Sequence, residues 1–273
     1  MRYRFIRVRD DSADELYLQL LSKNINNRYG VEISMKSYHI EKFISELEKL
    51  NISLSNDQIN QFIQYYELLV EKNKVMNLTA ITEFDEVIEK HFIDSLQLAK
   101  YVKLEKKIRL IDVGTGAGFP GIPLKIAFPE IESFLLDSLN KRILFLQEVI
   151  DELKLDGVTA LHGRAEDYGK NPVYRESFDL CVSRAVANMS SLSEYCLPFV
   201  KTGGYFIPYK SGNIDEEIEN SKKAVFLLGG KIEKVEKFYL EDAGRSLVFI
   251  KKEKTTSKKY PRKAGLPTKE PLG

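Results

Sequence analysis

The sequence lacks the features that mark secreted proteins and membrane proteins. It contains only two cysteines, Cys181 and Cys196, which are too few for a framework of disulfide bonds. Its apolar runs stay well below the roughly 20 residues that a membrane-spanning helix requires. No signal-peptide pattern is present near the N-terminus. We therefore expect a cytoplasmic protein that does not enter a membrane.

An excess of charge of one sign is lacking as well. The chain has 41 Lys or Arg residues against 40 Asp or Glu residues, a formal net charge of +1. Any contact with nucleic acid must therefore come from a local patch. Residues 251–273 hold eight Lys or Arg residues, two Glu residues and three prolines, with a local net charge of +6. This composition is not expected to form a core, and it predicts either a solvated disordered tail or a contact with nucleic acid.

One segment, residues 108–121, organises the rest of the chain. An apolar run ends at Val113 and is followed by four glycines, with Asp112 just before the first of them. Such a run is typical of a strand that is buried on both faces. Glycines at this density allow a tight turn and close approach to a ligand. Together with a helix expected at 122–128, the segment predicts a nucleotide-binding loop of a doubly wound fold.

Two kinds of cofactor compete for this loop. The dinucleotide pattern G-x-G-x-x-G fails when it is counted from Gly114, because its third position is Phe119, but it fits when it is counted from Gly116. An acidic residue two places before a G-x-G-x-G string suits S-adenosylmethionine better. The ammonium group of that cofactor needs carbonyl groups and a nearby carboxylate, and Asp112 could supply the carboxylate. The loop therefore favours S-adenosylmethionine and leaves a non-catalytic dinucleotide-binding regulator as the alternative.

Strands and helices alternate from residue 108 onward, which predicts a parallel sheet with helices on both faces. The expected strands cover 108–113, 133–137, 158–162, 178–183 and 204–208. Two further β-like runs, at 231–239 and 246–251, predict an antiparallel hairpin at the sheet edge. Helices are expected at 141–153, 190–199 and 215–227. Seven strands that end in such a hairpin describe a doubly wound, Rossmann-like methyltransferase fold better than a dehydrogenase.

The first part of the chain is expected to be helical. Apolar residues follow the helical period in three stretches, at about 38–50, 55–72 and 83–101, with a loop at 73–77. His91 lies beside the apolar stripe of the third stretch, where a hydrogen bond at a packing edge explains it as well as a function does. We divide the chain into an extension at 1–34, a helical cap at 35–105, a methyltransferase domain at 106–253 and a basic tail at 254–273.

Further candidate ligand contacts follow the second and third strands. Asp137 ends the second strand, where doubly wound folds bind ribose hydroxyl groups with an acidic residue. The loop from Gly163 to Asp167 follows the third strand and is expected to border an adenine ring. The acidic residues of this loop could equally be the N-cap of a short helix.

In methyltransferases the end of the fourth strand faces the atom that is methylated. Cys181 and Cys196 fall inside a strand and a helix, so both are better explained as small core residues than as a nucleophile. Asn171-Pro-Val-Tyr174 precedes the strand instead of following it, and we interpret it as a turn. Arg184 is left, with no evident base. N7 of guanine has a free lone pair and no proton to lose, so its methylation needs positioning and little else. Arg184 could contact the base or form an ion pair at the sheet edge.

With these residues assembled, the chain resembles the RsmG family, also called GidB, of bacterial methyltransferases that act on guanine N7 in 16S ribosomal RNA. The resemblance runs from about Met35 to the C-terminus. The matching segments are 77–81, 112–123, 136–142, 163–166, Ser183-Arg-Ala185 and Tyr260-Pro-Arg-Lys-Ala-Gly265. The string from Asp112 to Pro123 is the most specific of these. Residues 1–34 fall outside the resemblance.

The resemblance implies S-adenosylmethionine as cofactor, and cofactor contacts at Gly114, Phe119, Ala165, Glu166 and Arg184. It also implies a target guanine in the 530 loop of the small ribosomal subunit. We add Asp112, Gly116 and Asp137 to the expected cofactor site. The residues expected to contact RNA phosphates are Lys141, Arg142, Lys210, Arg245 and Arg262. We expect a monomer that binds no metal. A methyltransferase of the same fold that acts on a small molecule or a protein remains the alternative.

Overall fold

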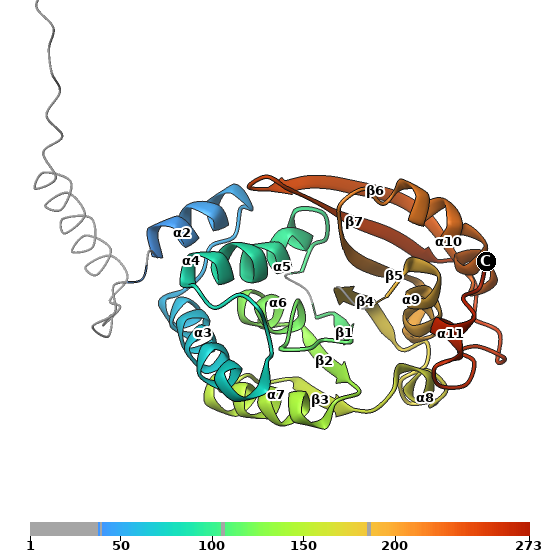
Figure 1. Cartoon of the computed structure of the whole chain (residues 1–273), viewed down its shortest axis with the longest axis horizontal. Coiled ribbons are helices and arrows are strands. Elements are labelled where there is room, and N and C mark those ends of the chain that lie inside the picture. Colours follow the sequence, from blue (N-terminus) through green and yellow to red (C-terminus); the bar gives the residue numbers. More distant parts are fainter. Residues whose placement is uncertain (1–37, 39, 105–106, 185–186) are drawn as a thin grey trace, which may run out of the picture.

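The computed structural model describes residues 38, 40–104, 107–184 and 187–273. The predicted extension at 1–34 lies outside these residues. A seven-stranded sheet, with the strand order β3-β2-β1-β4-β5-β7-β6, forms the centre of the molecule (Figure 1). The strands are β1 Arg109–Val113, β2 Glu132–Asp137, β3 Val158–His162, β4 Phe178–Arg184, β5 Val200–Ser211, β6 Gly230–Leu240 and β7 Ala243–Lys252.

The pairing of the strands confirms the predicted fold class. Strands β1 to β5 are parallel, and β7 runs antiparallel to both β5 and β6. The chain passes from β1 outward to β2 and β3, and then returns to place β4 on the other side of β1. At such a reversal the carboxyl ends of the strands leave a crevice in which ligands bind.

Side chains that alternate along the strands build a separate core on each face of the sheet. Leu110 of β1 and Leu135 of β2 belong to the core under the N-terminal helices, α6 (Gly121–Ala127) and α7 (Asn140–Glu152). Ile111, Val113 and Leu136 belong to the other core. The helices on that second side are α8 Ala165–Tyr168, α9 Met189–Cys196, the 3-10 helix η3 Leu197–Phe199, α10 Asp215–Leu227 and α11 Leu266–Lys269 (Figure 1).

The N-terminal helices form an additional layer over α6 and α7. They are α2 Ile40–Lys49, α3 Asn56–Met76, α4 Phe84–Val87, the π-helix η1 Ile88–Ile93, α5 Asp94–Leu96 and the 3-10 helix η2 Gln97–Lys100. The loop predicted at 73–77 is wrong for its first four residues, because α3 continues to Met76. The third predicted helix is present as a continuous helical stretch, but its middle turns are π-helical. Its single apolar stripe gave no sign of this change.

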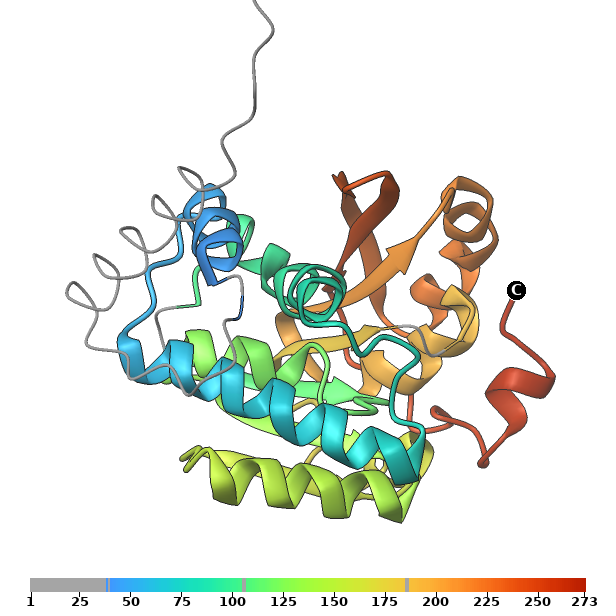
Figure 2. The same cartoon turned by 60° about the vertical axis from the view of Figure 1, so that its left-hand side comes forward.

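Helix α3 is fixed at its start by a capping box. Ser55 accepts a hydrogen bond from the backbone of Gln58, and the Gln58 side chain accepts one from the backbone of Ser55. The Gln58 amide also donates to the carbonyl oxygens of Ile126 and Ala127, at 2.7 and 3.2 Å, which are at the end of α6. One side chain therefore both starts α3 and docks it on α6. Farther along, α3 runs beside α7 (Figure 2).

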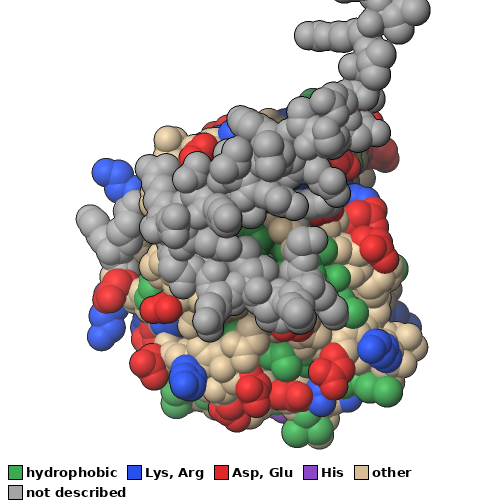
Figure 3. All heavy atoms as spheres, turned by 90° about the vertical axis from the view of Figure 1, so that its left-hand side faces the viewer, with side chains coloured by type: hydrophobic (Ala, Val, Ile, Leu, Met, Phe, Trp, Pro, Cys, Tyr) green, Lys and Arg blue, Asp and Glu red, His purple; other side chains and the backbone are tan. Residues whose placement is uncertain are grey.

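On the face that carries the N-terminal helices, Lys and Arg side chains are interspersed with Asp and Glu side chains (Figure 3). On α2, one of these helices, Lys49 and Glu46 form an ion pair at 2.6 Å. The visible part of this face therefore presents no continuous basic area.

The expectation that the basic tail cannot contribute to a core is wrong. Tyr260 is buried in the same core as α9, and Thr256 and Pro267 are buried as well. Arg175 donates hydrogen bonds to the carbonyl oxygens of Thr256 and Tyr260, at 2.6 and 2.9 Å. Composition misled here because a few residues of the tail, Thr256, Tyr260 and Pro267, pack against the protein, while most of its lysines are exposed. Across all of the described ranges, no helix has the length and apolarity needed to cross a membrane.

We expect Gln58→Ala to lower the free energy of unfolding by about 1–3 kcal/mol, because it removes one half of the capping box and the two bonds to α6. Urea denaturation followed by circular dichroism measures this loss. Asn60→Ala, at an exposed position of the same helix, is the control and should change stability by less than about 0.5 kcal/mol. Equal effects of the two substitutions would show that the bonds to α6 contribute nothing.

Candidate active site

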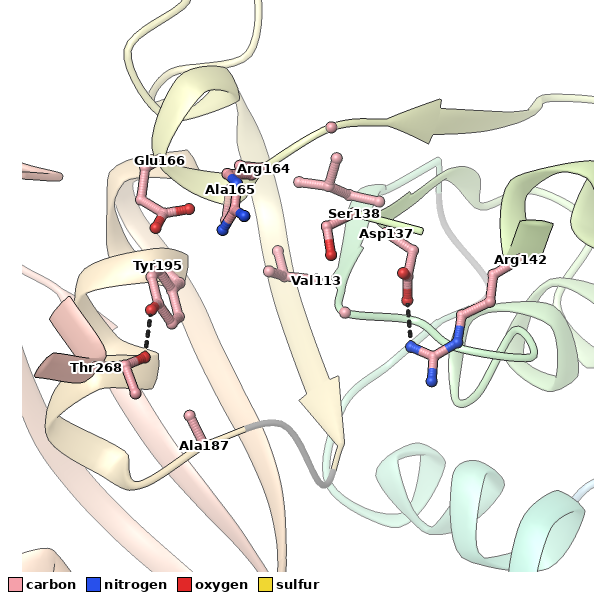
Figure 4. Close-up of a pocket in the computed structure, with 13 residues that line it drawn as sticks. Val113, Asp137, Ser138, Arg142, Arg164, Ala165, Glu166, Ala187, Tyr195 and Thr268 are labelled. Carbon is pink, nitrogen blue, oxygen red and sulfur yellow. Dashed lines mark hydrogen bonds and ion pairs between the residues drawn. The ribbon is translucent and has the colours of Figure 1, made fainter. Parts of the chain in front are cut away.

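A cavity of about 350 Å³ lies at the carboxyl ends of the strands, next to the reversal of strand order. It is lined by Val113, Gly114, Leu136, Asp137, Ser138, Arg142, Gly163, Arg164, Ala165, Glu166, Ala187, Tyr195 and Thr268. Figure 4 shows Asp137 and Arg142 on one side of this space and Glu166, Tyr195 and Thr268 on the other. Of the predicted cofactor contacts, the structure brings Gly114, Asp137, Ala165 and Glu166 together here.

Asp137 is held by several hydrogen bonds at the wall of the cavity. Its Oδ2 accepts from the backbone of Gly116 at 3.0 Å and from the Arg142 guanidinium at 3.1 Å. Its Oδ1 accepts from the backbone of Leu139 at 2.9 Å. These bonds fix the carboxylate at the end of β2. Because a carboxylate oxygen can accept two hydrogen bonds, Oδ1 retains capacity for one more donor, such as a ribose hydroxyl.

The loop after β3 supplies Ala165 and Glu166. Helix α8 begins at Ala165 with Arg164 as its N-cap, so the alternative that an acidic residue caps this helix is wrong. Glu166 is buried, and its Oε1 accepts a hydrogen bond of 2.8 Å from the backbone of Gly265. The side chain of Glu166 is thereby oriented by the C-terminal tail.

Asp112 holds the glycine loop in place through hydrogen bonds. Its carboxylate is fully buried, and Oδ2 accepts from the Thr115 hydroxyl at 2.7 Å and from the backbone of Gly121 at 2.9 Å. Burial raises the pKa of Asp112 to about 7, against the lowering effect of these two donors. Its Oδ1 has no hydrogen-bond partner. A buried carboxylate with a free oxygen fits a ligand that carries an ammonium group.

Two glycines of the loop have separate roles. Gly116 has a left-handed φ of 63°, and no atom lies within 4 Å of where a β-carbon would be, so its backbone is open to a ligand. Gly118 also has a positive φ, and a β-carbon there would lie 2.7 Å from the Tyr65 hydroxyl. That hydroxyl donates to the carbonyl oxygen of Ala117 at 2.6 Å. Gly118 therefore serves packing, whereas Gly116 leaves room for a ligand.

The start of α6 argues against the dinucleotide alternative. A pyrophosphate needs free backbone amides at a helix N-terminus. Pro120 and Pro123 have no amide hydrogen. The amide of Gly121 already donates to Asp112, and the amide of Ile122 donates to the carbonyl oxygen of Gly118 at 2.7 Å. The dinucleotide pattern counted from Gly116 is thus present in the sequence, but none of these backbone amides is free to bind a phosphate.

Arg184 lies on the other side of the glycine loop. Its neighbour two places back, Val182, packs in the core under the N-terminal helices, and Val113 at the cavity packs in the opposite core. The alternation of the strand therefore turns Arg184 toward those helices, where it donates to Asp94 at 2.8 Å. The Arg184 guanidinium lies 4.9 Å from the centre of the Phe119 ring. Arg184, Phe119, Asp112 and Gly116 do not line the cavity, so the structure does not bring these four predicted cofactor contacts together with Gly114, Asp137, Ala165 and Glu166 there.

His91 completes this second group of side chains. Its ring stacks on Phe119 with the centroids 4.6 Å apart. Nδ1 lies 3.2 Å from the Arg184 Nη2 and 3.0 Å from the Lys90 carbonyl oxygen. Nε2 shares a hydrogen bond of 2.8 Å with the Thr79 hydroxyl. Burial, assisted by the positive charge of Arg184, lowers the pKa of His91 to about 4. Sequence reasoning left His91 open between packing and function, and the π-helix that carries it was not foreseen.

Asp94 links this group to the hairpin. Its Oδ2 binds Arg184, and its Oδ1, which has no hydrogen-bond partner, lies 3.7 Å from the Arg245 Nε. Burial raises the pKa of Asp94, while the nearby charge of Arg184 opposes the shift. We name Arg184, His91, Asp94 and Phe119 the arginine cluster. The ion-pair alternative for Arg184 is what the structure shows.

The predicted RNA contacts are scattered. Lys141 is exposed, and Arg142 is at the cavity. Lys210 is largely buried and donates to the Ala187 carbonyl oxygen at 2.8 Å and to Glu217 at 2.6 Å. Arg245 is partly buried beside Asp94, and Arg262 binds the buried carboxylate of Glu194. Lys210 and Arg262 therefore have structural partners that sequence reasoning could not see.

Two smaller interpretations are confirmed. Cys181 and Cys196 are fully buried free thiols in the core. Asn171 forms a turn, with its side chain accepting from the backbone of Val173 at 2.9 Å. Tyr195 and Thr268, by contrast, line the cavity and were missed, because nothing in their local sequence distinguishes them.

Known proteins resemble this chain over most of its length. Residues 58–248 match the GidB family, described as rRNA small subunit methyltransferase G. A relative named ribosomal RNA small subunit methyltransferase G from Lachnoclostridium phytofermentans is 55% identical over 84% of this chain and 96% of its own length. Relatives of the same name from Clostridium tetani and Bacillus licheniformis are 52% and 51% identical, over 87% and 86% of this chain and 100% and 99% of their own lengths.

Solved structures are more distant. The TYW2 protein of M. jannaschii in complex with AdoMet has a TM-score of 0.49 and 15% identity, over 63% of this chain and 79% of its own. TrmN from Thermus thermophilus has a TM-score of 0.45 and 12% identity, over 60% of this chain and 53% of its own.

The lowered pKa of His91 predicts a pH dependence of stability. Below pH 6.5 the unfolded chain takes up a proton at this histidine and the folded chain does not, until the pH approaches 4. The wild-type chain should therefore lose about 1.6 kcal/mol of unfolding free energy through His91 between pH 6.5 and pH 5. His91→Gln should lack this loss.

Urea denaturation of both chains at several pH values measures the difference between their unfolding free energies, in which carboxylate titrations common to both cancel. His162→Gln, at an exposed histidine, is the matched control. A constant difference between wild type and His91→Gln from pH 7 to pH 5 would contradict the buried, neutral state of His91.

Proposed function

This chain belongs to the GidB family, rRNA small subunit methyltransferase G, and we propose that it methylates N7 of a guanine in the 530 loop of 16S rRNA, with S-adenosylmethionine as methyl donor. Family membership supports its assignment as an rRNA methyltransferase.

The cavity and the glycine loop offer the groups that S-adenosylmethionine requires. Asp137 would accept hydrogen bonds from the ribose hydroxyls, and Ala165 with Glu166 would border the adenine. Gly114 and the open backbone at Gly116 would pass the amino-acid end toward the free oxygen of Asp112. When it is bound, this cofactor supplies a methyl group on a positively charged sulfur.

The single observation that supports N7 as the acceptor is the state of the arginine cluster at the end of β4. His91 has its pKa lowered to about 4 and is held as a neutral ring between Thr79 and Arg184. Asp94 is bound to Arg184. An exocyclic amine would have to lose a proton during methylation, and these groups are poorly suited to remove it. N7 of guanine loses no proton, so the chain has only to orient the base and exclude water.

Arg184 and Phe119 are the groups in the cluster that suit a base. A guanidinium can donate to the O6 and N7 edge of guanine. Asp94 and the Lys90 carbonyl oxygen hold Nη1 of Arg184, at 2.8 and 3.1 Å. We therefore propose Arg184 as a residue that orients the target base, while its family-implied contact with the cofactor remains a proposal as well.

RNA phosphates require exposed positive charge. Lys141 and Arg142 lie at one end of α7 beside the cavity, and the tail contributes the exposed residues Lys258, Lys263 and Lys269. The visible part of the face of the N-terminal helices carries mixed charges, so that part is a poor alternative (Figure 3). We therefore place the RNA contact on the side of α7 and the tail, with the lysines of the tail taking the part first given to Arg262.

The proposed product is tested in cells that lack the gene for this chain. Borohydride and aniline cleave RNA at N7-methylguanosine, so 16S rRNA from wild-type cells should be cut in the 530 loop and that from deleted cells should not. The cut should return with the wild-type gene and stay absent with Asp137→Ala. A 530 loop that is cut equally in all strains would contradict the proposal and favour a small-molecule or protein substrate.

The proposed RNA contact predicts a change in salt dependence. Combined Lys258→Ala, Lys263→Ala and Lys269→Ala should weaken RNA binding and reduce the slope of log affinity against log salt by roughly 0.7–0.9 for each phosphate that is no longer neutralised. Fluorescence anisotropy with a labelled 16S fragment measures this slope. Lys49→Ala, on the mixed-charge face, is the control. An unchanged slope in the triple variant would remove the tail from the RNA contact.

A further inference from the structure

One buried ion pair attaches the C-terminal tail to helix α9. Glu194 of α9 is completely buried, and both of its carboxylate oxygens bind Arg262. The distances from Glu194 are 2.9 Å to Nε and 2.7 Å to Nη2, and the backbone amide of Arg262 donates to the same carboxylate at 2.7 Å. A buried carboxylate must be paired to remain charged. Arg262 is therefore fixed on α9.

Arg262 in turn fixes the residues that follow it. The backbone of Gly265 donates to Glu166 at 2.8 Å, and Glu166 lines the cavity. The carbonyl oxygen of Pro267 accepts from the hydroxyl of Ser191 on α9 at 2.8 Å. The tail thus crosses from α9 to the edge of the cavity and is bonded on both sides.

Thr268 brings a tail side chain to the cavity itself. Its hydroxyl and the hydroxyl of Tyr195 lie 2.6 Å apart, and both residues line the space on the side of Glu166 (Figure 4). The shared hydrogen bond holds the Tyr195 side chain in one orientation. Two of the polar groups at this end of the cavity, Glu166 and Tyr195, are therefore positioned by the tail.

We propose that the segment from Arg262 to Thr268 is a positioning element of the cofactor site, which sets Glu166 and Tyr195 for the adenosyl end of S-adenosylmethionine. This proposal rests on the proposed function, because it takes the cavity as the cofactor site. The charged residues of the tail and its folded part then have different roles. The exposed lysines face solvent, whereas Arg262 and Thr268 face the protein and the cavity.

Thr268→Val tests the positioning role, because it removes the hydroxyl while keeping the shape and leaving no buried charge. Titration calorimetry should show an affinity for S-adenosylhomocysteine about five to ten times lower than that of the wild type, the loss typical of one hydrogen bond at a binding surface. Thr268→Ser, which restores the hydroxyl, should bind as the wild type does. Thr255→Val, at an exposed threonine earlier in the tail, is the matched control and should also bind normally. The melting temperatures of all the variants should agree.

Arg262→Leu provides a second measurement. If the variant folds, KM for S-adenosylmethionine should rise by at least tenfold, while kcat at saturating cofactor and the salt slope of RNA binding stay near their wild-type values. An unfolded Arg262→Leu chain leaves the decision to Thr268→Val.

The outcomes are separable. Normal affinity in Thr268→Val overturns the positioning role and leaves the proposed function standing. A wild-type chain that does not bind S-adenosylhomocysteine would overturn the proposed function, and the positioning role with it. Equal losses in Thr268→Val and Thr268→Ser would show that the hydroxyl is irrelevant and would also contradict the proposal.

Discussion

The geometry of the site depends on the buried carboxylate of Asp112. It lies near the end of β1, and its bonds to Thr115 and Gly121 close the glycine loop over the strand and start α6. The cost of burying this carboxylate is visible in its pKa, which burial raises to about 7. The same bonds occupy the first amide of α6, which leaves the loop unsuited to a pyrophosphate. A single side chain therefore both builds the loop and narrows the class of ligand that the loop can take.

The residues of the proposed site lie on two different faces of the sheet. Val113 and Leu136 bring one face to the cavity, and Arg184 extends from the other face toward the N-terminal helices. The π-helix η1 brings His91 against both Arg184 and Phe119. π-helical turns are rare in proteins, and those that occur are often found at functional sites. In the proposed reaction the adenosyl end of the cofactor would lie in the cavity, and the arginine cluster would hold the base at the end of the cofactor that carries the methyl group.

Charge and structure are separate properties in the C-terminal tail. Its composition is that of a solvated basic segment, yet Tyr260 and Pro267 are buried and Arg262 binds Glu194. Deleting the tail would therefore expose core and break an ion pair at the same time as it removed charge. Only substitutions of single side chains can separate a contact with RNA from support of the cavity.

The sequence by itself determined the fold, because alternation of strands and helices, the edge hairpin and the glycine loop are local patterns with few topological solutions. The alternation of side chains along β4 was also enough to determine on which face of the sheet Arg184 lies, because residues two apart share a face. Only the tertiary structure decided which basic side chains already have partners, as Lys210 and Arg262 do, and which distant residues meet at the cavity. Tyr195 and Thr268 are 73 residues apart and touch through their hydroxyls. Contacts between residues so far apart depend on how whole elements pack, and no local pattern encodes them.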